Sequence, residues 1–195
     1  MPQFRLFHNF EQNAVFTANP CEEGHLPPFL DGDYFEGESD AQGVCLECLL
    51  TGRKIVELDP YLRSKVEKQA HTPAAAKRMI RELERTPPVP WIQYNDWPFC
   101  CGAPMQYRGE YSSDHLFADD ELADFPQCLW EIVDAVGKQQ AADFESLQDS
   151  IEDGITACFI FKCLKCHRFE AVCQSYKPMV LSARLIWEGE APAEP

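Results

Sequence analysis

The chain has 195 residues and a formal net charge of −15, which comes from 17 Lys and Arg against 32 Asp and Glu. The hydrophobic fraction of 45% is that of a folded protein, and no apolar run approaches the length of a membrane span, so a disordered chain and a membrane protein are both disfavoured. The negative charge argues against binding to nucleic acid, whose phosphates would be repelled.

The first 58 residues have the pattern of short strands and turns. Residues 4–8 predict a strand. Residues 20–40 are rich in Pro, Gly and acidic side chains and predict an exposed excursion, with a short strand around Tyr34 and Phe35.

Residues 60–86 predict helices. The apolar residues recur at helical spacing, and the segment restarts at Thr72, an N-cap, with Pro73 at the first helical position. The side chains expected in the core from this part are Leu62, Met79 and Leu83.

The C-terminal half predicts helices between strands. A strand is expected at 105–109 and a helix from about 118 to 138, with Phe125, Leu129 and Val133 buried. A shorter helix is expected around Phe144, Leu147 and Ile151. Two strands joined by a Cys-bearing turn should follow, at 156–162 and 168–174.

These elements predict an α+β fold, with a small antiparallel sheet, zinc-ribbon-like knuckles and helices packed on one side. We expect residues 1–177 to form a single domain, with an N-terminal knuckle region (1–58), a helical region (60–86) and a knuckle, strand and acidic helical region (91–177). Residues 178–195 would add a C-terminal strand at about 178–187 and a frayed, proline-rich tail.

The negative charge is concentrated in one segment. Residues 110–153 contain 13 Asp or Glu and a single basic residue, Lys138, which gives a net charge of −12. Residues 53–85 are basic instead, with a net charge of +4. A strongly acidic segment of this kind favours association with a basic partner.

The chain contains ten cysteines, and the role expected of them depends on whether the protein lies in an oxidising or a reducing compartment. The first eight residues lack the basic segment and apolar stretch of a secretory signal, so we expect a cytoplasmic protein. Disulfides do not persist in a reducing cytosol, and these cysteines are more typical of metal ligands and core residues. Three lie on apolar faces of predicted elements and are expected as core thiols: Cys128, Cys158 and Cys173.

Cys163-Leu-Lys-Cys166 is the clearest metal-binding motif. It lies between two β-rich segments, where a tight turn directs both sulfurs at one point, as in a zinc-ribbon knuckle. Cys45-Leu-Glu-Cys48 has the same spacing. The first motif, followed by His167, also matches a c-type haem attachment pattern, but that chemistry requires export.

Other residues complete two sites for structural zinc, since a tetrahedral zinc takes four Cys or His ligands. The two predicted ligand sets are Cys21, His25, Cys45 and Cys48, and Cys100, Cys101, Cys163 and Cys166. A competing assignment places the two regular Cys-x-x-Cys pairs on one ion. One or two zinc ions are therefore expected.

Catalytic motifs are missing from the sequence. The histidines are scattered, and there is no Gly-x-Ser-x-Gly, no His-Glu-x-x-His and no phosphate-binding Gly loop. Sulfur-rich ligand sets form closed structural metal sites rather than open catalytic ones. We therefore expect that the protein is not an enzyme.

The order and spacing of several motifs resemble the CbrC family of small bacterial cytosolic proteins, one of which is linked to colicin tolerance. The resemblance covers about residues 4–174 and rests on Phe4-Arg-Leu-Phe-His8, Cys21, Cys45-x-x-Cys48 with Leu-Leu-Thr-Gly52, Arg85-Thr-Pro87, Trp91-Ile-Gln93, Trp97, Cys101-Gly102, Tyr107-x-Gly109 and Phe161-Lys-Cys163-Leu-Lys-Cys166. Residues 91–109 are also faintly similar to YwqG-like proteins.

The chain departs from the family pattern at both sites. The family tends to have a full Cys-x-x-Cys near Cys21, where this chain has Gly24 and His25. It also tends to have His-Cys followed by a further Cys, where this chain has Cys100-Cys101 and then Met105. The resemblance thus implies that Cys100 replaces a family ligand.

The resemblance implies a function as an immunity protein, because relatives are often proposed to neutralise bacterial toxins. The toxin would be a nuclease whose basic active site is covered by the acidic face. The expected contact residues are Asp114, Asp119, Asp120, Glu121, Asp124, Trp130, Glu131 and Asp134. The alternatives are a zinc-ribbon interaction module in stress response or transcription and, less favoured, a metal-dependent hydrolase.

Overall fold

The computed structural model describes residues 3–38, 42–111 and 125–175, which form a mixed α+β fold of short elements. The α+β class predicted from the sequence is confirmed. The elements of the first half are α1 (Phe10–Asn13), β1 (Phe16–Thr17), β2 (Phe29–Asp31), the 3-10 helix η1 (Gly32–Tyr34), β3 (Gly43–Cys45), α2 (Leu46–Thr51), α3 (Pro60–Gln69) and α4 (Pro73–Leu83).

The second half contributes most of the β structure and three helices. Its elements are β4 (Phe99–Cys100), β5 (Ala103–Pro104), β6 (Gln106–Tyr111), α5 (Phe125–Ile132), α6 (Ala135–Gln140), α7 (Phe144–Glu152), β7 (Thr156–Lys162) and β8 (Phe169–Ser175). The strands form three antiparallel sheets in the orders β1-β2-β3, β4-β5 and β6-β7-β8. The predicted C-terminal strand and proline-rich tail, residues 178–195, lie outside the described residues.

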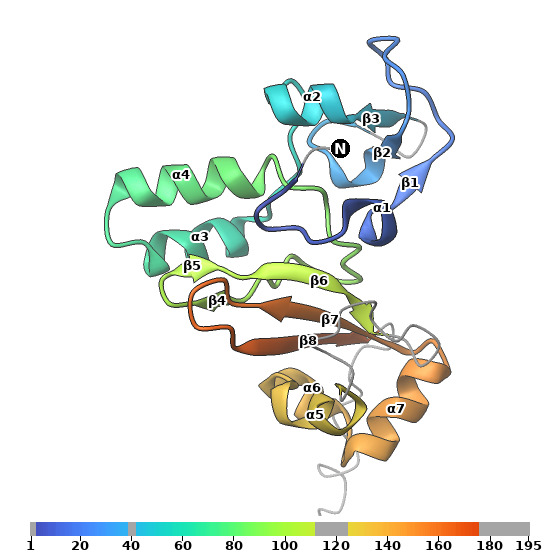
Figure 1. The fold of residues 1–195 in the computed structure, drawn as a ribbon, viewed down its shortest axis with the longest axis vertical. Coiled ribbons are helices and arrows are strands. Elements are labelled where there is room, and N and C mark those ends of the chain that lie inside the picture. The colour runs from blue at the N-terminus through green and yellow to red at the C-terminus, as the bar shows by residue number, and fades with distance from the viewer. Residues whose placement is uncertain (1–2, 39–41, 112–124, 176–195) are drawn as a thin grey trace, which may run out of the picture.

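The β6-β7-β8 sheet is covered on both faces, with α5, α6 and α7 on one side and the N-terminal part of the chain on the other (Figure 1). Consecutive residues of β7 point to opposite faces, and all seven are buried. Cys158 and Ile160 pack with Leu129 and Leu147 of the helices, in the smaller core cluster. A strand that is buried on both faces has a continuous run of apolar residues, and β7 has such a run from Ala157 to Phe161.

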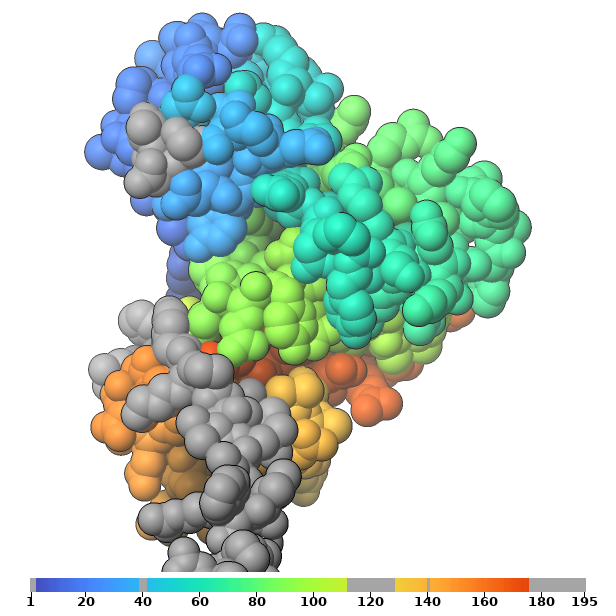
Figure 2. Space-filling view, turned by 180° about the vertical axis from the view of Figure 1, so that it is seen from behind, coloured from blue at the N-terminus to red at the C-terminus, as the bar shows by residue number. Residues whose placement is uncertain are grey.

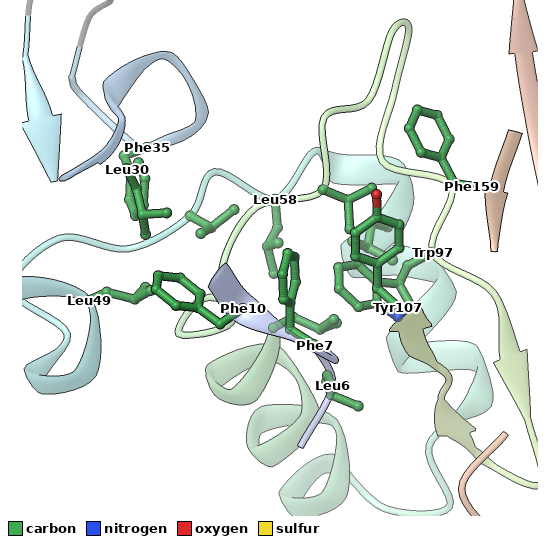
Figure 3. Close-up of a cluster of buried hydrophobic side chains, with 14 of the residues drawn as sticks. Leu6, Phe7, Phe10, Leu30, Phe35, Leu49, Leu58, Trp97, Tyr107 and Phe159 are labelled. Carbon is green, nitrogen blue, oxygen red and sulfur yellow. The ribbon is translucent and has the colours of Figure 1, made fainter. Parts of the chain in front are cut away.

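Aromatic rings fill the opposite face. Phe161 stacks on Trp91 with ring centroids 5.7 Å apart, and it lies 5.5 Å from Trp97 and 5.4 Å from Tyr107. Phe159 packs 5.1 Å from Trp91. The cluster continues into the N-terminal part, and the rings of Phe7 and Tyr107 are 5.1 Å apart (Figure 3).

The predicted restart of the helical region is confirmed. The Asp59 carboxylate caps α3 by accepting from the Leu62 N–H, and the Thr72 hydroxyl caps α4 by accepting from the Ala75 N–H. Each helix begins with a proline, whose missing N–H costs nothing in the first turn. In the core, Leu62 and Leu83 are buried as predicted, and Met79 is half-buried.

The predicted strand at residues 4–8 is wrong. This segment turns, with the Phe7 N–H donating to the Phe4 carbonyl. It meets β6 through the Tyr107 N–H to the Leu6 carbonyl, the His8 N–H to the Tyr107 carbonyl and the Gln106 side chain to the Arg5 carbonyl. The turn brings closely spaced phenylalanines into one aromatic cluster, which an extended strand would separate. Of the short strand expected around Tyr34 and Phe35, Tyr34 lies instead in the 3-10 helix η1, and Phe35 forms an isolated bridge with Val56.

The predicted helix at 118–138 is also corrected. In the described part, α5 ends at Ile132 and α6 begins at Ala135, because Val133 forms a bridge with Ala171 of β8. The Asp134 N–H donates to the Ala171 carbonyl, and its carboxylate caps α6 by accepting from the Gly137 N–H. Leu129 and Val133 are buried as predicted. The side chain of Phe125 lies outside the described residues.

No helix in the described ranges is both long enough and apolar enough to span a membrane.

We predict that Phe161→Ala lowers the free energy of unfolding by about 3–5 kcal/mol, because it removes a fully buried ring from the aromatic cluster. The measurement is urea denaturation followed by circular dichroism. Tyr61→Ala is the control, since that side chain is 58% exposed, and it should change stability by less than about 1 kcal/mol. Equal losses in both variants would contradict the core position of Phe161.

Candidate metal centres

The first cluster joins a loop with the junction between β3 and α2. Cys21 and His25 lie between β1 and β2, Cys45 ends β3 and Cys48 lies in α2. All four ligand atoms lie within 4.8 Å of one another. The sulfurs of Cys21 and Cys48 are 3.8 Å apart, and His25 Nδ1 is 3.1 Å from Cys45 Sγ and 3.5 Å from Cys48 Sγ.

Local backbone geometry brings these ligands together. Cys45 is the N-cap of α2, and its sulfur accepts from the Cys48 N–H, so both sulfurs lie at the N-terminal end of that helix. The Cys21 loop crosses close to β3 at Gly43, where a Cβ would lie 2.1 Å from the carbonyl oxygen of Asn19. A glycine at this position is therefore required for the approach.

Glu47 supports the histidine of this cluster. His25 directs Nδ1 towards the sulfurs, and its Nε2 lies 3.6 Å from the Glu47 carboxylate. A carboxylate on the far ring nitrogen of a metal-binding histidine fixes its tautomer and orientation. Arg53 pairs with Glu47 in turn, at 2.8 Å. Glu47 is not among the residues predicted from the sequence, although it lies inside the Cys45-Leu-Glu-Cys48 motif.

The second cluster lies where two β-turns meet. Cys100 ends β4 and Cys101 lies in the turn to β5, while Cys163 and Cys166 lie in the turn between β7 and β8. The four sulfurs are within 4.8 Å of one another. Cys100 Sγ is 3.8 Å from Cys101 Sγ and 3.4 Å from Cys166 Sγ.

Both turns of the second cluster contain residues in the left-handed region. Cys101 has φ 54° and Gly102 φ 76°, which is the pattern of a tight two-residue hairpin. In the other turn, Cys163 Sγ accepts from the N–H groups of Lys165 and Cys166, and His167 closes the turn with φ 61°. The turn that contains Cys163 and Cys166 therefore has the geometry of the predicted zinc-ribbon knuckle.

The thiols within each cluster differ in their pKa values. Burial raises the pKa of Cys163, but the N–H donors of Cys166 and Lys165 outweigh it and lower that pKa to about 6. Burial, with the neighbouring thiols, raises the pKa of Cys100 to about 12. The first cluster repeats the pattern, with the pKa of Cys21 lowered to about 7 and that of Cys48 raised to about 12. Four thiolates together would repel one another unless a cation lay between them.

The clusters fit a tetrahedral metal ion. Bond lengths of about 2.3 Å to sulfur and about 2.0 Å to nitrogen give edges of about 3.8 Å between two sulfurs and about 3.5 Å between sulfur and nitrogen. The observed separations, 3.4–3.8 Å between sulfurs and 3.1–3.5 Å from His25, are close to these edges. Both clusters can therefore hold a metal ion. The two regular Cys-x-x-Cys pairs lie in different clusters, which rules against their assignment to one ion.

Cys158 and Cys173 are buried as predicted, but the expectation that they are free thiols is wrong. They are joined by a disulfide between β7 and β8. The strand register places them directly opposite each other, with Cα atoms 4.3 Å apart. The side chain of Cys128 lies outside the described residues.

The predicted partner-binding residues fall into two groups. Five lie outside the described residues, namely Asp114, Asp119, Asp120, Glu121 and Asp124. Of the other three, Glu131 is exposed, and Trp130 is half-buried with the Lys138 ammonium 5.9 Å above its ring. The Asp134 carboxylate accepts from the N–H groups of Gly137 and Cys173, so it holds α6 to β8.

The fold and its two Cys/His clusters define a small α+β protein equipped for metal binding. Over residues 1–174 the chain matches the model of an uncharacterised protein family (UPF0167), and it belongs to that family. The CbrC resemblance of the sequence points to the same family, while the YwqG-like resemblance stays a prediction. Neither the curated proteins nor the solved structures gave a match.

We predict that His167→Gly keeps the second cluster intact, because glycine adopts φ 61° without steric cost. His167→Val should lower the free energy of unfolding by about 1–2 kcal/mol, because a β-branched residue is strained there. Thermal denaturation and metal titration measure both. Loss of metal binding in His167→Gly alone would instead identify His167 as a ligand.

Proposed function

We propose that both clusters bind zinc and that the zinc is structural. The donors are seven thiols and one imidazole, a set typical of structural zinc sites, and each cluster supplies a complete set of four. Each ion would join segments far apart in sequence, Cys21 to Cys48 and Cys100 to Cys166. Zinc would therefore stabilise the fold by closing these loops and by neutralising the thiolates.

We predict two zinc ions per chain, counted by native mass spectrometry. Cys45→Ser and Cys163→Ser should each retain one ion, because each removes a ligand from a different cluster. His71→Ala is the matched control: His71 is exposed beside the turn at Gly102 but outside both clusters, and this variant should retain two. A folded wild-type chain without zinc, or one ion lost in His71→Ala, would contradict the assignment.

As its function we propose that the protein binds and neutralises a bacterial toxin of the nuclease class through its acidic C-terminal part. The observation that carries this proposal is the charge on α7. Glu145, Asp149 and Glu152 are exposed at helical spacing, and among the described residues none of them pairs with a Lys or Arg. Uncompensated carboxylates attract a basic surface and speed association with it.

Other features support a binding role. The acidic helices rest on a sheet whose β7 is buried throughout, so the charged surface has a firm support. Glu131 is exposed on α5, and the neighbouring Trp130 offers an aromatic side chain of the kind that anchors interfaces. Covering a basic nuclease site requires this combination of charge and preorganised shape.

The test mixes the purified protein with nuclease toxins of the same genome and measures complex formation, nuclease inhibition and cell survival. We predict that the reversal to Lys of Glu145, Asp149 and Glu152, or of Asp119, Asp120 and Asp124, weakens a complex by at least about tenfold at low salt. The charge-matched control reverses Glu11, Glu36 and Glu67, which are exposed elsewhere on the chain.

If all three triple variants weakened the complex equally, its affinity would depend on the net charge of the protein and not on the acidic C-terminal part. If no toxin binds and no cell is protected, the proposal fails. Loss of nuclease inhibition in the two acidic variants, with the control unchanged, supports it.

A further inference from the structure

A pocket of about 270 Å³ lies between the N-terminal part of the chain and the loop that precedes β4. Its floor is apolar, with Leu58, Leu62 and Leu83. Figure 2 shows this face, on which segment 86–97 lies between the segment around η1 and helix α3. None of the site residues discussed above lines this pocket.

The pocket walls are aromatic. Trp91, Trp97, Tyr34 and Tyr94 contribute rings, and Tyr94 is 42% exposed at the surface. Faces of Trp and Tyr rings attract cations, and guanidinium groups also stack on them. The pocket can therefore attract a cationic group as well as an apolar one.

The charge at the pocket has one sign. Asp33, Glu57 and Asp59 line it, and no Lys or Arg does so in the part of the chain that the structure describes. Asp59 is used by the fold, since its carboxylate accepts from the N–H groups of Leu62 and Asn95. Asp33 and Glu57 are exposed, and no Lys or Arg among the described residues forms an ion pair with either.

The acidic field continues beyond the pocket towards the C-terminal part. Asp96 lies next to this wall, since its N–H donates to the Tyr94 carbonyl. Burial raises the pKa of Tyr94, and Asp96, Tyr61 and Asp134 raise it further. Two cations near the pocket are each paired with a carboxylate: Lys65 with Asp96 at 2.8 Å, and Arg63, which donates to the Leu58 carbonyl, with Glu84 at 3.1 Å. A positive group approaching the pocket would therefore meet the negative potential of Asp33 and Glu57.

The wall loop is held in place before any ligand binds. The side chain of Gln174, buried at the end of β8, accepts from the N–H groups of Ile92 and Gln93 and donates to the Tyr94 carbonyl. Asn95 donates to the Glu57 carbonyl, which ties the loop to the opposite wall. Such preorganisation lowers the entropic cost of binding.

We propose that this pocket receives an arginine side chain of a basic protein partner, with the guanidinium against the aromatic wall and paired with Asp33 and Glu57. Arginine fits better than lysine because its planar group both stacks on rings and pairs bidentately with carboxylates. The inference rests on the proposed function only in taking the partner to be a basic protein, and it adds an anchor point outside the acidic helices.

The test uses the tripeptide acetyl-Gly-Arg-Gly-amide and its citrulline analogue, which has nearly the same shape but no charge. Nuclear magnetic resonance follows the indole N–H of Trp91 and the amide N–H groups of Tyr94 and Asn95. The arginine peptide should give saturable shifts and bind about tenfold more tightly than the citrulline peptide. The double variant D33N/E57Q should lose about the same factor.

The matched control is the double variant E67Q/D153N, which changes the charge equally at exposed acids away from the pocket and should bind like the wild type. Equal affinity for both peptides, shifts confined to α7, or full binding by D33N/E57Q would each overturn the proposal. The peptide assay needs no toxin, so peptide binding without toxin binding would reject the immunity function and leave the pocket assignment standing.

Discussion

The antiparallel pairing of β7 with β8 is the constraint on which the rest of the structure depends. Seven residue pairs hold these strands in a single register, from Thr156 opposite Ser175 to Lys162 opposite Phe169. Beyond the last pair, the turn directs Cys163 and Cys166 towards the β4–β5 turn. At the other end of the hairpin, Gln174 holds the loop that forms the pocket wall. A shift of one residue would reverse every side chain of these strands, so register and site are specified together.

The two metal centres differ in what surrounds them. The first has three buried cysteines and a half-buried histidine, whereas Cys101 and Cys166 of the second are exposed. The first cluster fixes a region with only very short strands, where little other regular structure holds the loops. The second closes the end of a hairpin that the sheet already supports. We therefore infer that the N-terminal region would depend more on a bound ion than the central sheet would.

Much of the fold follows from local sequence signals. Thr72 with Pro73 marks a helix start because both the cap and the proline act within one turn, and Cys163 with Cys166 predicts a knuckle because the spacing alone fixes the turn. The failures involve contacts distant in sequence. The segment at 4–8 turns because its phenylalanines pack on Tyr107, and the helix at 118–138 breaks where Val133 meets Ala171. The disulfide could have been predicted, since Cys158 and Cys173 lie equally far from the 163–168 connection between β7 and β8, but the expected reducing compartment argued against it.

The acidic side chains of the protein affect its folding energetics as well as the charge of its surface. Burial raises the pKa of Asp134 and also that of Glu170, where Asp134 and Asp96 add repulsion. The folded state thus binds these protons more tightly than the unfolded chain, and the ionised carboxylates oppose folding at any pH above their raised pKa values. Asp134 remains because it caps α6 and reaches β8, a role that a neutral apolar residue cannot fill. A basic partner bound near these acids would relieve the repulsion, so the same like-charge crowding that weakens the free protein would strengthen its complex with that partner.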